Sequence, residues 1–337
     1  MIATPETLVV EPVSQPQTPE AKPAPAAEST PLDPTQQDAV YENLYLTGRP
    51  KLKHFIRYVR SHAVNPPGEA ELTAEWEAAR DVVRTLEQEE AGLADNPTVR
   101  MVGLEYKSFL TEFLKDPLVR HGFNTVPTEV AFVELDRMVV YQRHIDLRFA
   151  RQLESKLGPA PSEDELFRTC LPYDHPQPPV KWSRVHGNQF VFVSPSNDLR
   201  FLGTMRMQAE HIKDYPPPGT LVGVVGVAVG FGSNFLNAIY AENRLVLNNG
   251  SHRAYALRKM GITHVPCIVQ HVSTRDELDL VAADEVRRAP DFFLKHPRPT
   301  MLKDYFDPRL HKVMPVNRRM HQVTVRFEVE ENFFPAL

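Results

Sequence analysis

One segment of the chain, residues 244–269, constrains the fold more than any other. It reads RLVLNNGSHRAYALRKMGITHVPCIV. Leu245–Leu247 is apolar and partly β-branched, which predicts a buried strand. Asn248–Gly250 then supplies residues that tolerate a positive φ. A helix-forming run from Ser251 to Met260 and an apolar run, Val265–Val269, follow. The segment therefore predicts a strand, a tight turn, a helix, a second turn and a strand.

The tight turn predicts an anion site. Backbone N–H groups without partners and the positive end of a helix dipole meet at Gly250 to Arg253. The same turn carries a cation, Arg253, and a titratable donor, His252. Phosphate is the usual guest of such a turn. The alternative is an ordinary strand-to-helix turn, with Ser251 as the N-cap and Arg253 on the surface.

The run from Asn249 to Arg253, with the alanine-rich helix and Gly261–Val269 after it, resembles the signature segment of the ParB/sulfiredoxin-like superfamily. Members of that superfamily place a Gly-X-X-Arg turn at a helix start to hold nucleotide phosphates. Residues 133–146 resemble the first box of those domains, which lines the nucleotide pocket. The resemblance implies an α+β fold with a mixed sheet. It also implies a nucleotide site formed by Asn249, Gly250, Ser251, His252, Arg253, Gln142, Arg143 and His144.

Members of this superfamily differ in function, so the resemblance alone does not fix one. ParB proteins bind CTP and clamp DNA, sulfiredoxins use ATP to repair oxidised cysteines, and free-serine kinases phosphorylate an amino acid. Ser251 stands where sulfiredoxins have a cysteine, and a hydroxyl lacks thiolate chemistry. The motif is closest to that of the serine kinases, but Asn249 replaces their aspartate and removes a negative charge that Mg²⁺ or a substrate hydroxyl would use.

Three functions follow from these features. The first is an NTP-dependent phosphotransferase or NTP hydrolase that binds ATP, ADP or CTP, with a small-molecule acceptor and with Mg²⁺ if the protein is catalytic. Its candidate catalytic residues are His252, Asp146 and Glu242. The second is a non-enzymatic protein that senses a nucleotide or binds a partner through the same turn. The third is a ParB-like DNA-binding protein. No motif indicates a metal-ligand set.

Charge and composition bear on the third function and on the compartment. The formal net charge is -5 with a sequence pI of about 6.2, whereas DNA binding requires a basic surface. DNA is therefore disfavoured as a partner. The two cysteines imply no disulfide framework, which predicts a cytoplasmic protein. No apolar run has the length of a membrane span, and the sequence leaves the oligomeric state open.

The chain predicts three parts. Residues 1–36 contain eight prolines and predict a disordered tail. Residues 37–122 predict a helical accessory subdomain, in which Tyr41, Leu44 and Tyr45 recur at helical spacing. Residues 123–337 predict the nucleotide-binding domain, with a β-rich insertion and a C-terminal extension. The basic run from Arg49 to Arg60 predicts a solvated helix face.

Shorter patterns give further expectations. Phe190–Val193 predicts a strand, and Gly230–Ser233 predicts a hairpin turn. Residues 205–218 predict an irregular segment that covers a pocket or packs as a loop. Ser162 and Thr274 each precede a glutamate by three residues, which predicts two capping boxes.

Overall fold

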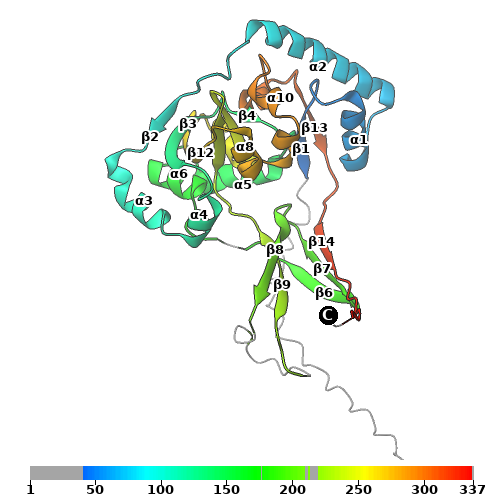
Figure 1. Ribbon diagram of the computed structural model, residues 1–337. Coiled ribbons are helices and arrows are strands. Elements are labelled where there is room, and N and C mark those ends of the chain that lie inside the picture. The colour runs from blue at the N-terminus through cyan, green and yellow to red at the C-terminus, as the bar shows by residue number, and fades with distance from the viewer. Residues whose placement is uncertain (1–40, 176, 209–211, 213–218, 336–337) are drawn as a thin grey trace, which may run out of the picture. The chain divides into compact units, whose positions relative to one another are not determined.

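Figure 1 shows the computed structural model of the chain, which describes residues 41–175, 177–208, 212 and 219–335. These residues belong to one compact unit, residues 39–337. The expected Pro-rich tail lies outside the described residues. So does most of residues 205–218, although Met205 and Met207 belong to a strand.

The chain folds as a mixture of helices and sheets, with a six-stranded sheet at its centre (Figure 1). Its strand order is β2-β3-β12-β10-β11-β4. Two neighbouring pairs, β10 with β12 and β11 with β4, are parallel, and the other three are antiparallel. The sheet is therefore mixed, as expected. The strands are β2 (Val99–Met101), β3 (Thr128–Glu134), β4 (Val139–Val140), β10 (Asn237–Ala241), β11 (Arg244–Asn249) and β12 (His264–His271).

Both faces of this sheet are covered, because successive residues of β11 pack into different cores. Leu245 and Leu247 belong to the larger core, which includes residues of α6 (Glu163–Cys170) and α7 (Ser251–Lys259). Val246 belongs to a second core. There it packs with residues of α8 (Arg275–Val281), α9 (Asp284–Arg288) and α10 (Pro290–Leu294).

A second sheet corrects the expectation for residues 41–45. β1 (Glu42–Leu46) is a strand between β13 (His311–Pro315) and β5 (His144–Asp146). The helical spacing of its aromatic residues was misleading, because strand alternation sends neighbours into two different cores. Leu44 enters the larger core. Tyr45 instead belongs to a third hydrophobic core, where its ring stacks on that of Tyr58 with the centroids 4.1 Å apart.

Helices fill most of the segment between β1 and β3, as predicted. They are α1 (Leu52–His62), α2 (Glu69–Glu89), the 3-10 helix η2 (Leu104–Tyr106), α3 (Lys107–Phe113) and α4 (Pro117–Gly122). After β5 comes α5 (Leu147–Leu157). None of the helices in the described ranges combines the length and apolar character needed to cross a membrane.

The β-rich insertion forms two small sheets. β6 (Lys181–His186) and β7 (Gln189–Ser194) pair in one sheet, to which β14 (His321–Arg326) adds a third strand. β8 (Leu199–Met207) pairs with β9 (Val224–Phe231) in the other. The strand predicted at Phe190–Val193 is confirmed, and so are both capping boxes. The hairpin turn predicted at Gly230–Ser233 is wrong, because β9 pairs with β8, and the next strand, β10, belongs to a different sheet.

A buried ion pair joins α2 to the 3-10 helix η4 (Leu302–Phe306). Arg298 is fully buried and donates to both carboxylate oxygens of Asp304, at 2.8 and 2.6 Å. It also donates to Glu90, directly after α2, at 2.9 Å. Asp304 also accepts a hydrogen bond from the backbone N–H of Met301, at 3.0 Å. The pair therefore fixes η4 by satisfying both buried charges.

We expect Asp304→Asn to lower the free energy of unfolding by about 3–5 kcal/mol, because it leaves Arg298 as a buried cation without its main partner. Denaturant unfolding measures this loss. Asp307→Asn is the control, since Asp307 pairs with the exposed Arg309 and its loss costs about 1 kcal/mol or less. Equal losses in the two variants would contradict the role of the buried pair.

Candidate functional site

The turn between β11 and α7 is built on a glycine in the left-handed region. Gly250 has φ 98° and is the N-cap of α7. A Cβ at this position would lie 2.6 Å from Leu236 Cδ1. Ser251 was expected to be the N-cap, and this is wrong: Ser251 is already the first helical residue, and no side chain caps the helix. The reason is that the left-handed Gly250 completes the reversal one residue earlier.

Gly250→Ala is expected to destabilise the protein by about 2–5 kcal/mol, from left-handed strain and from the overlap with Leu236. Gly261→Ala is the matched control, because Gly261 has φ 86° and open space around its Cα. Strain alone predicts about 1–2 kcal/mol for the control. Thermal and denaturant unfolding of the two variants measures how much stability each one loses. Equal losses would contradict the contribution of close packing against Leu236.

Arg253 is buried, with 6% of its surface exposed, so the alternative interpretation, which put this arginine on the surface, is wrong on that point. Its Nη1 donates to the carbonyl oxygens of Cys170 and Asn234, at 3.1 and 3.2 Å. Its Nη2 donates to Asn234 Oδ1 at 2.6 Å. No carboxylate among the described residues lies within ion-pair distance. Burial consequently lowers the pKa of Arg253. The guanidinium is held by neutral oxygen atoms only.

The neighbouring segment, residues 233–236, lies against the turn. Asn249 Nδ2 donates to the carbonyl oxygens of Ser233 and Phe235, at 2.9 and 3.2 Å. Together with the Arg253 bonds to Asn234, these contacts fasten the segment to the start of α7. Ser251 is 5% exposed, whereas Asn249, Gly250 and His252 are partly exposed. Residues 233–236 thus cover part of the turn, and Asn249, Gly250 and His252 keep partial exposure.

The first box approaches the turn through His144. Its ring lies 6.2 Å from that of His252, between centroids, and Phe149 lies 5.8 Å from His252. Asp146 caps α5, because its Oδ1 accepts from the N–H groups of Arg148 and Phe149 at 2.9 and 3.3 Å. Burial lowers the pKa of His252 to about 4, and His144 lowers it further while Asp146 opposes the shift. His252 is therefore neutral at pH 7.

The lowered pKa of His252 predicts a pH-dependent stability. An unfolded histidine has a pKa near 6.5, so between about pH 6.5 and pH 4 the unfolded chain binds more protons than the folded chain. Stability should therefore fall as the pH falls through this window, by up to about 3 kcal/mol from this group.

Denaturant unfolding of wild type and His252→Gln, repeated at several pH values, measures this contribution. Glutamine does not titrate, so we expect a flatter dependence in the variant. His186→Gln serves as the control because His186 is exposed on β6. Parallel profiles for wild type and His252→Gln would contradict the burial of a neutral imidazole.

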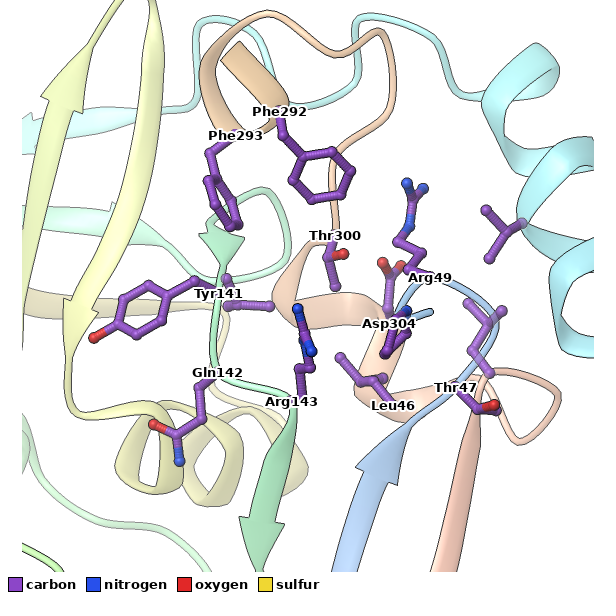
Figure 2. Close-up of a pocket in the computed structure, with 14 residues that line it drawn as sticks. Leu46, Thr47, Arg49, Tyr141, Gln142, Arg143, Phe292, Phe293, Thr300 and Asp304 are labelled. Atoms are coloured by element: carbon purple, nitrogen blue, oxygen red, sulfur yellow. The ribbon is translucent and has the colours of Figure 1, made fainter. Parts of the chain in front are cut away.

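The remaining predicted site residues lie elsewhere. Gln142 Nε2 donates to the carbonyl oxygen of His144 at 3.0 Å, so Gln142 orders the first box. Arg143 is exposed and lines a separate cavity (Figure 2). Glu242 lies in the turn before β11 and pairs with Arg275 at 2.6 Å. The whole of β11, roughly 20 Å at about 3.3 Å per residue, separates it from Asn249. The structure therefore does not bring Glu242 together with His252.

The separate cavity was not predicted. It has a volume of about 50 Å³ and lies between the turn after β1, the β4–β5 connection and residues 292–304 (Figure 2). Arg49 lines it, and its side chain is only 8% exposed, so the expectation of a solvated basic run is wrong for this residue. The lining residues are scattered through the sequence, and no local pattern predicts them. Its polar lining consists of Thr47, Arg49, Tyr141, Gln142, Arg143, Thr300 and Asp304.

Comparison with known proteins adds no relative: no family model, curated protein or solved structure matches the chain. Within the described ranges, no three His, Cys, Asp or Glu side chains gather as a metal site would require. Cys170 and Cys267 are buried free thiols.

Proposed function

We propose that the chain is a ParB/sulfiredoxin-like protein that binds a nucleoside triphosphate or diphosphate, such as ATP, ADP or CTP. The phosphates are held at the start of α7, by the turn from Asn249 to Arg253. One observation carries this proposal: Arg253 is a buried cation with no carboxylate partner among the described residues. A buried charge is costly unless an opposite charge meets it, and a phosphate supplies that charge.

The start of α7 fits a phosphate in one further way. The amides of His252 and Arg253 have no hydrogen-bond acceptor among the described residues, as is usual in the first turn of a helix. Unpaired N–H groups at a helix start form the usual cradle for phosphate. Gly250 has a different part, because its missing side chain lets Leu236 of the covering segment pack against the turn.

The position of the first box indicates which other side chains contact the nucleotide in this proposal. The ring centroids of His252 and His144 lie 6.2 Å apart, and in this proposal both imidazoles contact the nucleotide. Arg143 lies in the other cavity and has no part in this proposal. Segment 233–236 forms the covered wall. Any Mg²⁺ would arrive with the nucleotide, near Asp146 as the closest acidic group of the first box.

The geometry supports nucleotide binding more strongly than it supports catalytic turnover of the nucleotide. Asp146 is engaged as a helix cap through Oδ1, and Asn249 donates to the covering segment instead of facing a ligand. These observations favour a nucleotide-sensing or partner-binding protein as the second candidate function. A phosphotransferase or NTP hydrolase needs a general base, for which His252 and Asp146 are the residues brought closest to the turn.

Nucleotide binding is tested by calorimetric titration of ATP, ADP and CTP, each with and without Mg²⁺. We expect Arg253→Gln to weaken the bound nucleotide by about 10- to 100-fold, the equivalent of about 1.5–3 kcal/mol for a hydrogen bond to a charged group. Arg258→Gln is the matched control: it removes the same charge from the same helix, where Arg258 pairs with Asp136. Circular dichroism and the melting temperature establish that each variant is folded.

Two results would refute the proposal. One is the absence of binding for every nucleoside phosphate offered to the wild-type protein. The other is unchanged affinity in folded Arg253→Gln. Phosphate release and product chromatography then separate the candidate functions: release or transfer indicates an enzyme, and binding without turnover indicates a sensor.

A further inference from the structure

Two strands of the β-rich insertion form a sheet of their own. β8 and β9 pair antiparallel as a two-stranded ribbon (Figure 1). Among the described residues, no strand continues the ladder on the other edge of either one. A two-stranded ribbon is marginally stable in water by itself, and the unpaired N–H and C=O groups of an edge can pair with a further strand. Each outer edge of the ribbon is therefore a possible site for another chain.

The outer edge of β8 is protected against such pairing. Arg200, which pairs with Asp198, and Arg206 are both exposed along the strand. The register shifts between Phe201 and Gly203, so β8 contains a bulge. Charged side chains and bulges are the usual means by which proteins keep an edge strand from pairing with another molecule. The edge of β8 therefore disfavours a partner strand.

The outer edge of β9 has none of these protections. The strand is eight residues long, VVGVAVGF, and contains neither a charged residue nor a proline. It lies within residues 215–241, the longest stretch of the sequence without Asp, Glu, Lys or Arg. An exposed, uncharged edge strand of this length pairs readily with another strand. The contrast between the two edges indicates that β9, and not β8, is the strand that meets a partner.

The side chains of β9 fit an apolar partner strand. Val225, Val227 and Val229 share one face of the ribbon, because side chains alternate along a strand. Val225 is 75% exposed and Val227 is 43% exposed. On the opposite face, β8 already packs over β9, since a Cβ at Gly226 would lie 3.1 Å from Met205 Cγ. The apolar side chains that a partner strand can cover are therefore the valines.

We propose that β9 pairs with β9 of a second copy of this chain, antiparallel and across a two-fold axis. With Val227 opposite its own symmetry copy, Val225 lies opposite Val229 of the partner subunit, and the valines form one row of β-branched cross-strand pairs. An uncharged edge meets its own copy without repulsion, whereas two β8 edges would bring arginines together. The resulting sheet has the order β8-β9-β9-β8, and its two outer edges are the protected edges of β8. It therefore closes as a dimer and does not grow into a filament.

Analytical ultracentrifugation of the full chain over a range of concentrations measures the association. We expect a reversible monomer–dimer equilibrium for the wild-type protein. Val227→Lys and Val227→Glu should each raise the dimer dissociation constant at least about tenfold, because each variant sets like charges one strand spacing apart, roughly 4.8 Å. An equimolar mixture of the two variants should recover the dimer, since lysine then lies opposite glutamate.

Thr204→Lys is the matched control. Thr204 is the exposed neighbour of Val227 on β8 and shares its face of the ribbon. In the proposed sheet a charge at Thr204 lies three strand spacings, roughly 14 Å, from its own copy, so the dimer affinity should stay within about threefold of wild type. Circular dichroism and the melting temperature of each diluted variant establish that its monomer is folded.

Four results would overturn the proposal. The first is a wild-type protein that remains monomeric up to roughly 1 mM, which would mean that a different occupant, such as a nucleic acid or a strand of another protein, meets the ribbon. The second is a dimer that both Val227 variants leave intact, and the third is a mixture of the two that stays monomeric. The fourth is an equal loss in Thr204→Lys, which would move the contact from the edge of β9 to the face of the ribbon. All four leave the nucleotide proposal standing, because no residue of β9 belongs to that site.

Discussion

The buried guanidinium of Arg253 determines how three distant parts of the chain meet. Arg253 lies in α7 and donates hydrogen bonds to Cys170 at the end of α6 and to Asn234 before β10. Backbone bonds continue the same junction: Leu236 N–H donates to Cys170 O at 2.8 Å, and Ile268 N–H donates to Leu236 O at 3.0 Å. The approach of β10 to β12 thus depends on a cation in an apolar setting. Such a cation is stable only when all of its donors find oxygen atoms.

The buried arginines of the described chain fall into two groups. Arg298 meets Asp304 and Glu90, and Arg244 meets Asp95 at 2.6 Å. These pairs follow the rule that a buried charge is neutralised nearby. Arg253 has only neutral acceptors among the described residues. Since the fold supplies carboxylates to the first group, Arg253 is the arginine at which our proposal puts an anion from solution.

The sequence predicted well what local pattern controls. The strand–turn–helix–strand order of residues 244–269, the mixed sheet and both capping boxes follow from periodicity and turn chemistry. It failed where distant residues decide. Local spacing predicts a helix at β1, because the pairing of β1 with β13, more than 260 residues later, leaves no local pattern. The burial of Arg49 depends on α2 and residues 292–304, and so its cavity had no sequence signature.

The neutral state of His252 bears on both proposed functions of the turn, catalysis and nucleotide sensing. With a pKa of about 4, its imidazole is uncharged at pH 7 and is a weak acid catalyst in the free protein. An anion bound beside it would favour the charged form and raise that pKa, which is the converse of the burial that lowers it. The ligand itself would then prepare His252 to donate a proton. In a protein that only senses nucleotide, the same coupling makes affinity increase as the pH falls. Under either proposed function, a rise in this pKa on binding would be accompanied by proton uptake.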